Sequence, residues 1–221
     1  MKRHIGFSLL LLLFMIGWHA CVTQPDPPLP IIGNWYVENG DTIYPVIADF
    51  RFIDQDSQWV TNETFAGKLY AVDFFFIHCP TICPKTVKQM KRVHDHFLDD
   101  DRVLLLNYSI DTRNDTVPAL KRYAEKLGVS SDKWHFVTGD KDAIYEIADD
   151  YFSVAKEDPE APGGFDHSGR LILVDGKGHV RSFCDGTDSQ DVDRFIKDIE
   201  KLLREEYGGY PASQNSAGSS H

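Results

Sequence analysis

Apolar residues along this chain alternate between strand-like runs and helix-like spacings. Continuous apolar runs, rich in aromatic and β-branched residues, are typical of strands that are buried on both faces. Such runs occupy residues 69–77 and 103–110, and shorter strand-like segments follow at 134–138, 170–174 and 179–184. Apolar residues between and after these runs recur three and four positions apart, which predicts helices. The predicted helices are residues 86–98, the segment from Pro118 to the terminating Gly128, the segment that Asp140 caps, and a last helix capped by Asp188 or Ser189.

The order of these elements predicts an α/β fold. Three strand–helix pairs are followed by a hairpin, which turns at residues 175–178, and by a closing helix. A further hairpin precedes them, with strands within 47–53 and 58–61. This order describes a thioredoxin-like fold with an N-terminal β-hairpin extension and an insertion. Asp54 and Asp56 lie in the turn of the first hairpin, but the glycine and glutamate of a calcium loop are missing, which favours a plain turn.

The N-terminus has the pattern of an export signal. A basic start, Lys2 and Arg3, precedes an apolar stretch from Ile5 to Trp18. That stretch is too short to span a bilayer of roughly 30 Å. Cys21 follows Ala20, which is where a bacterial lipoprotein signal places its lipidated cysteine, although a tryptophan stands where leucine is usual. A plain cleaved signal and an uncleaved short anchor are the alternatives.

We therefore expect a signal peptide at 1–20, a lipid-anchored, Pro-rich tether at 21–32, a domain at 33–206 and a disordered tail at 207–221. The domain would be monomeric and would face the extracytoplasmic, periplasmic side of a membrane. The formal net charge of the chain is −11. This charge argues against nucleic acid as a partner and against docking on anionic lipid by charge.

Two of the four cysteines, Cys79 and Cys83, lie between a strand and a helix. The run 69–77 stops just before Cys79, and Pro84 suits the first turn of a helix. Unpaired N–H groups and the helix dipole at this position favour thiolate over thiol in both cysteines. A structural disulfide is a weak alternative, because closing so short a loop adds little stability. Cys184 is interpreted as a buried or half-buried free thiol.

Two kinds of chemistry are open to such a thiolate pair. It can shuttle between dithiol and disulfide, or it can bind a soft ion such as copper(I). His167 follows a Gly-rich loop and directly precedes a strand, and in a thioredoxin-like fold this part of the chain passes beside the cysteines. Sulfur suits copper(I) and imidazole helps to hold copper(II), so Cys79, Cys83 and His167 together favour copper. A closed structural zinc site would want a fourth protein ligand.

The motif F-F-F-I-H-C-P-T-I-C-P resembles the signature of the Sco/SenC family of copper proteins, which serve the assembly of cytochrome c oxidase. The similarity continues through D-T-R-N-D-T-V-P-A-L-K-R-Y, W-H-F-V-T-G, F-D-H-S and L-I-L-V-D-G-K-G, and it covers about Gly33 to Glu206. It implies a thioredoxin-like fold, a membrane-tethered domain outside the cytoplasm, and copper bound by Cys79, Cys83 and His167. Cys184 falls where the family is expected to have an aromatic residue, which adds a competing thiol.

Three functions are consistent with these residues. The first is a copper metallochaperone that passes one copper ion, Cu(I) or Cu(II), to the copper-receiving subunit of a cytochrome c oxidase. The second is an enzyme, a thiol-disulfide reductase whose redox pair Cys79 and Cys83 keeps the recipient's cysteines reduced. The third is a copper or redox sensor without a delivery role. His167→Ala distinguishes the first two, since it should weaken copper retention and leave dithiol exchange largely intact.

Other polar residues near the motif have an ordinary interpretation beside a functional one. His78 adjoins the first cysteine but is not expected to be a ligand. Asp166 either orients His167 or is a plain loop acid. His135 and His179 are interpreted as packing or surface histidines.

The polar loop after the run 103–110 contains Asp111, Arg113 and Asp115. These residues either face a partner protein or form an internal ion-pair network at the edge of the sheet. The internal network is the favoured interpretation.

Overall fold

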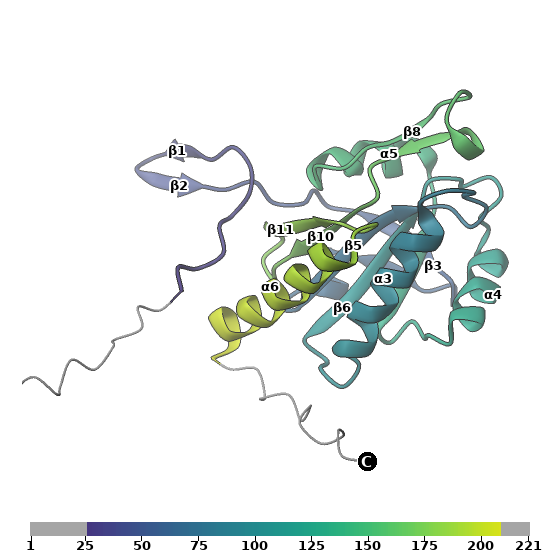
Figure 1. Cartoon of the computed structure of the whole chain (residues 1–221). Coiled ribbons are helices and arrows are strands. Elements are labelled where there is room, and N and C mark those ends of the chain that lie inside the picture. Colours follow the sequence, from purple (N-terminus) through teal and green to yellow (C-terminus); the bar gives the residue numbers. More distant parts are fainter. Residues whose placement is uncertain (1–25, 209–221) are drawn as a thin grey trace, which may run out of the picture.

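A computed structural model describes residues 26–208 of the chain, and Figure 1 shows their arrangement. The predicted signal peptide, Cys21 and residues 209–221 of the predicted tail lie outside the described residues, whereas Tyr207, which the sequence places in the tail, ends the last helix. The strands and helices follow in the order β1 (Tyr36–Glu38), β2 (Asp41–Ile43), β3 (Arg51–Asp54), β4 (Trp59–Thr61), α2 (Asn62–Phe65), β5 (Leu69–Phe75), α3 (Cys83–His96), β6 (Val103–Ser109), α4 (Val117–Leu127), β7 (Trp134–Thr138), α5 (Lys141–Asp150), β8 (Ala155–Glu157), η2 (Pro162–Gly164), β9 (Phe165–His167), β10 (Arg170–Val174), β11 (Val180–Asp185) and α6 (Ser189–Tyr207). No helix in this part of the chain is both long and apolar enough to cross a membrane.

A seven-stranded sheet forms the centre of the molecule, with the strand order β11-β10-β5-β6-β7-β3-β4. Strands β5, β6 and β7 are parallel, and the strands on either side of them are antiparallel. Side chains alternate across each strand, so β5 presents Phe75 to Tyr123 of α4 on one face and Phe74 to Tyr151, which follows α5, on the other. The α/β fold that the strand and helix order predicts is confirmed.

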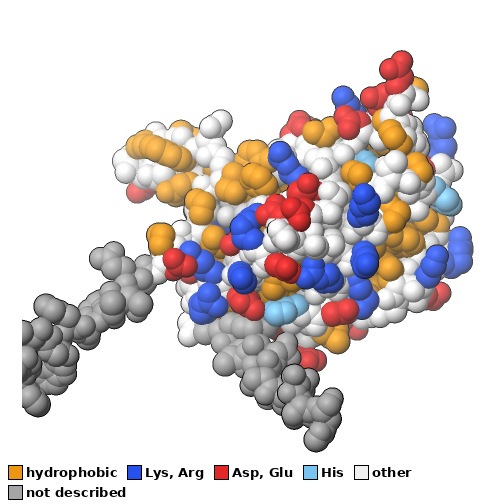
Figure 2. Space-filling model, viewed as in Figure 1, with side chains coloured by type: hydrophobic (Ala, Val, Ile, Leu, Met, Phe, Trp, Pro, Cys, Tyr) orange, Lys and Arg blue, Asp and Glu red, His pale blue; other side chains and the backbone are white. Residues whose placement is uncertain are grey.

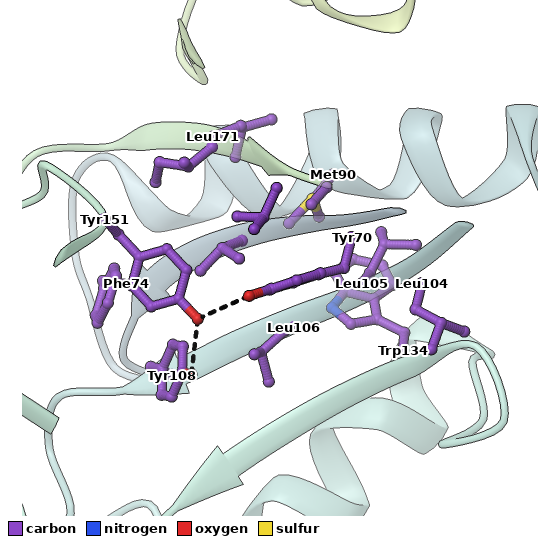
Figure 3. Close-up of a cluster of buried hydrophobic side chains, with 14 of the residues drawn as sticks. Tyr70, Phe74, Met90, Leu104, Leu105, Leu106, Tyr108, Trp134, Tyr151 and Leu171 are labelled. Carbon is purple, nitrogen blue, oxygen red and sulfur yellow. Dashed lines mark hydrogen bonds between the residues drawn. The ribbon is translucent and has the colours of Figure 1, made fainter. Parts of the chain in front are cut away.

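Three tyrosines connect the sheet to the segment after α5 inside the core (Figure 3). The hydroxyl of Tyr151 lies 3.1 Å from that of Tyr108 and 3.4 Å from that of Tyr70. All three side chains are buried. Their hydroxyls therefore satisfy one another where water is excluded, so the core tolerates these polar atoms.

The structure contains one short hairpin that the sequence predicts and two strand pairs that it does not predict. The hairpin of β3 and β4 is confirmed, and its turn is a plain one, because the Asp54 carboxylate accepts the N–H groups of Asp56 and Gln58. A second hairpin, β1 with β2, precedes it and projects from the body of the molecule (Figure 1). In the insertion, β8 pairs with β9, so His167 ends a strand rather than a loop.

Candidate metal centre

The two motif cysteines follow the central strand β5. After Phe75 the chain turns through residues 76–82, and α3 begins at Cys83 with a proline in its first turn. The predicted strand–loop–helix arrangement is therefore present. It brings both cysteines to the carboxyl end of a parallel strand, the edge of an α/β sheet where ligands bind.

The sulfur of Cys79 acts as an acceptor at the start of α3. Its Sγ accepts the backbone N–H of Cys83 at 3.4 Å, and no conventional side-chain cap is present at this helix. Burial alone would raise the pKa of the Cys79 thiol, but hydrogen bonds from the backbone N–H groups of Cys83 and Thr81 outweigh it, and the pKa lies below its ordinary value. The predicted preference for thiolate therefore holds at Cys79.

The same preference was also predicted for Cys83, and there it is wrong. Burial raises the pKa of the Cys83 thiol far above its ordinary value, and the negative charge of Asp73 adds to the effect. Only 2% of Cys83 is exposed. The first helical turn cannot compensate, because desolvation of a fully buried sulfur penalises the thiolate more than the helix N-terminus favours it.

His167 ends β9, in the insertion between α5 and β10, and its side chain reaches the cysteines from there. Its position is fixed by pairing of β9 with β8, where Ala155 lies opposite His167, and by an edge-on contact with the ring of Phe76 at 5.5 Å between centroids. Burial lowers the pKa of His167, although a hydrogen bond with the backbone of Phe165 acts in the opposite direction. The imidazole is therefore neutral near pH 7, the form that binds metals.

The three candidate ligand atoms form one cluster. The Nε2 atom of His167 lies 3.1 Å from the sulfur of Cys83 and 3.8 Å from that of Cys79. All three atoms lie within 4.8 Å of one another, and no other cluster of three histidine, cysteine or acidic groups among residues 26–208 is as compact. Ligands about 2.0–2.3 Å from one ion are at most roughly 4.6 Å apart, and the two nitrogen–sulfur distances of 3.1 and 3.8 Å lie within this limit. Two sulfurs and an imidazole at this spacing thus fit a single soft or borderline transition-metal ion.

Asp115 holds the segment that leads into Cys79. Its Oδ2 atom accepts the backbone N–H of Ile77 at 3.0 Å and the hydroxyl of Ser109 at 2.7 Å. The predicted internal role of this loop is therefore present, but it consists of hydrogen bonds rather than an ion-pair network. Asp111 bonds Asn114 within the loop, and Arg113 is exposed.

Asp73 is the buried polar residue that sequence reasoning missed. Its Oδ2 atom accepts hydrogen bonds from Asn107 at 3.1 Å and from the Thr86 hydroxyl at 3.3 Å, and the same hydroxyl lies 3.3 Å from the carbonyl oxygen of Cys83. The other carboxylate oxygen of Asp73 is buried without a partner. The signal that could have found it is a single acid in the otherwise apolar strand Y-A-V-D-F-F.

The remaining candidates lie outside the cluster. His78 is exposed. Asp166 lies on β9 rather than in a loop, and it pairs with Lys156 at 3.4 Å, which favours an ordinary surface acid over a partner of the imidazole. Cys184 is a buried free thiol in β11, as expected. The histidines at 135 and 179 pair with buried carboxylates and are structural, as expected: His135 with Asp54, and His179 with Asp175.

Comparison with known proteins gives the family. The sequence model of SCO1/SenC proteins matches residues 40–204, which is most of the chain. The chain belongs to the SCO1/SenC family. The SCO1 protein homolog of Bacillus subtilis is 30% identical to it over 159 residues, which cover 70% of this chain and 81% of that protein. The family match confirms the resemblance carried by the cysteine motif and the F-D-H-S segment.

Solved structures of SCO1/SenC proteins share the fold of this chain. BsSco, a member of the Sco family of cytochrome c oxidase assembly proteins in which a disulfide switch has been identified, aligns with a TM-score of 0.62 and 29% identity, over 71% of this chain and 92% of that structure. The copper-bound structure of Arabidopsis thaliana ScoI aligns with a TM-score of 0.60 and 23% identity, over 72% and 99% respectively. The thioredoxin-like fold is thereby confirmed.

Proposed function

We propose that this SCO1/SenC protein is a copper metallochaperone that carries one copper ion on Cys79, Cys83 and His167 and serves the assembly of a cytochrome c oxidase. The observation that carries the proposal is the convergence of two sulfurs and one imidazole nitrogen, all within 4.8 Å, from two distant segments of the chain. Membership of the family and the copper-bound ScoI of Arabidopsis thaliana support copper as the cargo.

The donor set suits a metal that is taken up and then passed on. Thiolates bind copper(I) strongly, and an imidazole also accommodates copper(II). Both cysteines bind as thiolates, so copper uptake must release the proton of Cys83, whose pKa is raised by burial. Three protein ligands also leave a position from which a recipient's ligand can enter.

Copper retention by ligand variants tests this function. The reduced chain is loaded with copper(I) without oxygen, desalted and analysed for metal. Wild type should keep one copper per chain, Cys79→Ser and Cys83→Ser should lose it, and His167→Ala should bind it more weakly. Cys184→Ser is the matched control, since Cys184 is as buried as Cys83 but lies outside the cluster. Equal loss of copper from Cys184→Ser, or full retention by Cys79→Ser and Cys83→Ser, would contradict the proposal.

A second function, thiol-disulfide reduction of the recipient, is favoured by the unequal thiols. The Cys79 thiolate would attack a recipient disulfide, forming a mixed disulfide and releasing one recipient thiolate. Cys83, whose proton passes to a released recipient thiolate, would displace the second recipient sulfur and form the 79–83 disulfide, so the recipient gains two electrons. The disulfide switch of BsSco is consistent with such chemistry in a relative. His167→Ala should leave the rate of this exchange nearly unchanged.

Attachment to the extracytoplasmic side of a membrane completes the proposal. The apolar stretch that ends at Trp18, followed by Cys21, supports an exported chain with an N-terminal lipid anchor. The recipient would be the copper-binding subunit of the oxidase in the same membrane. Labelling with radioactive palmitate in a bacterial host, with Cys21→Ser as the control, tests the anchor directly.

A further inference from the structure

The β1–β2 hairpin carries apolar side chains that the rest of the described chain does not cover. The tripeptide Trp35–Val37 is exposed along its whole length, and Tyr44 and Val46 are exposed on the returning segment. Figure 2 shows these hydrophobic side chains gathered on the part that projects from the body. An isolated two-stranded hairpin is only marginally stable in water, and an exposed apolar cluster of this kind marks an interaction surface.

The hairpin lies beside the start of β5, at the end of the sheet opposite the metal cluster. Its base is held by backbone hydrogen bonds from Ile32 to Val180 and from Ile47 to Gly178, beside the turn between β10 and β11. That turn is next to the start of β5, because Val174 pairs with Tyr70. The cysteines follow the other end of β5, and its seven residues rise roughly 20 Å.

The segment before the hairpin is fixed to the same edge. The N–H of Leu29 donates to Glu205 at 2.9 Å, and Arg181 donates to the carbonyl oxygens of Leu29 and Pro30 at 2.7 and 3.1 Å. The chain is therefore fixed to the body of the domain from Leu29 onward, and an ion pair of Asp26 with Lys201 at 3.6 Å lies just before this point. Eight residue steps separate Cys21 from Leu29, and a fully extended chain of this length reaches at most about 29 Å.

We propose that the β1–β2 hairpin lies in the headgroup interface of the bilayer and holds the metal cluster on the side of the domain that faces away from the membrane. The proposal rests on the membrane attachment proposed above. A short tether fixed beside the hairpin brings this edge, and not the edge with the cysteines, close to the lipid. Trp35 and Tyr36 are residue types that prefer the bilayer interface, where an aromatic ring is buried and its polar atom stays hydrated.

Charge identifies the kind of lipid surface. Residues 33–46 contain Glu38 and Asp41, both at the tip of the hairpin, and no lysine or arginine. Anionic lipid is attracted by basic residues, which this segment lacks. The contact therefore depends on the apolar and aromatic side chains. Vesicles of zwitterionic phosphatidylcholine are the appropriate probe. The acidic tip would remain in water while the flanking strands contact the lipid.

Quenching of tryptophan fluorescence by lipid tests the proposal. The lipoprotein that begins at the lipidated Cys21 is reconstituted into vesicles of phosphatidylcholine brominated near the headgroup end of its acyl chains, and attachment is verified by flotation. Trp35→Phe should lose most of the bromolipid-dependent quenching. Trp59→Phe is the matched control: Trp59 is 57% exposed and Trp35 is 59% exposed, but Trp59 lies on β4, at the far end of the sheet from β11. The lipoprotein begins at Cys21 and therefore lacks Trp18, and the buried Trp134 is common to both variants.

Each other outcome overturns the proposal in a different way. A chain that does not float with the vesicles contradicts the membrane attachment and the hairpin proposal together, and leaves the copper function untouched. A floating chain in which Trp35→Phe keeps the wild-type quenching contradicts the hairpin contact alone. Trp35 emission that is shifted to the blue but is not quenched would assign the surface to a protein, such as the recipient or a second copy of this chain.

Discussion

At the scale of single residues, Cys79 and Cys83 share one motif but have different surroundings. Cys79 receives hydrogen bonds from backbone N–H groups, which keep its thiol pKa below the ordinary value. Cys83 lies deeper, near the carboxylate of Asp73, and its pKa is raised. The proposed functions therefore give the two sulfurs different roles before metal arrives: Cys79 would be the nucleophile or the first ligand, and Cys83 would first have to lose a proton.

This difference predicts the order of alkylation. In the metal-free, reduced chain near neutral pH, iodoacetamide should modify Cys79 first, because only the thiolate reacts. Peptide mass mapping over time measures the order, and Cys184 is the internal control, since burial raises its pKa as well. Modification of Cys83 or Cys184 before Cys79 would show that the electrostatic description of the site is wrong.

Asp115 positions the segment before Cys79, so its removal should affect copper without removing a ligand. Asp115→Ala leaves the N–H of Ile77 without its acceptor, and loss of such supporting contacts weakens metal binding by about 10–100-fold. Competition with a copper(I) chelator measures the change. Asp111→Ala is the control, because Asp111 is also a buried acid of this loop but bonds Asn114 within it. Equal weakening in both variants would contradict a specific role of Asp115.

At the scale of elements, the insertion brings His167 to the cysteines because its loop packs closely on the segment after β5. Gly163 has a φ of 82°, and a Cβ atom there would lie 2.7 Å from Phe76 and 3.0 Å from Pro80. Only glycine combines this backbone conformation with such a close approach. Phe76 in turn contacts both Phe165 and the imidazole of His167.

Gly163→Ala should therefore displace the loop and weaken copper binding. Gly164→Ala is a matched control, since Gly164 also has a positive φ of 86° but no heavy atom lies within 4 Å of the added Cβ. Both variants should lose about 1 kcal/mol of stability from backbone strain, and only Gly163→Ala should also lose copper affinity. Chemical unfolding and chelator competition measure the two effects, and equal copper affinities would rule out this packing role.

The sequence predicts some elements much better than others. The strand β5, the start of α3 and the hairpin of β10 and β11 follow from long apolar runs and from residues with fixed turn preferences, so their positions could be predicted. The strands β1, β2, β8 and β9 have three residues each and are largely exposed or half-buried. They carry no periodic pattern, and the structure alone reveals that His167 ends one of them.

At the scale of the whole molecule, a buried carboxylate couples pH to stability. Burial raises the pKa of Asp73 to about 7, despite hydrogen bonds from Thr86 and Asn107. Such a carboxyl holds its proton more tightly in the folded than in the unfolded state. Its contribution to the free energy of unfolding is therefore full at acidic pH and is lost as the pH rises from about 4 to about 7.

Asp73→Asn should remove this pH-dependent loss of stability. The free energy of unfolding of the variant, relative to wild type, should increase between pH 4 and pH 8 by up to roughly 4 kcal/mol, at about 1.4 kcal/mol per pH unit. Urea unfolding of the metal-free proteins at several pH values measures it. Asp100→Asn is the control: a hydrogen bond from Arg102 lowers the pKa of Asp100, so its difference from wild type should stay flat over this range. A flat profile for Asp73→Asn would contradict the buried-acid description.

The metal cluster could be predicted from sequence only in part. The cysteine spacing and the F-D-H-S segment predict the three candidate ligands, because the family resemblance connects residues that are 84 positions apart. Asp73 and Asp115 could not be assigned their roles, since these depend on the pairing of β5 with β6, which sets Asp73 opposite Asn107. The position of the hairpin at the opposite edge also follows only from the assembled sheet.

The X-ray absorption spectrum of the copper-loaded chain tests the central claim most directly, because it reports the atoms bound to the metal. We predict two sulfur neighbours and one nitrogen neighbour at a single copper site, with the nitrogen contribution absent from His167→Ala. A wild-type spectrum with sulfur neighbours only, or a nitrogen contribution that is unchanged in His167→Ala, would contradict the assignment of Cys79, Cys83 and His167 as the ligands.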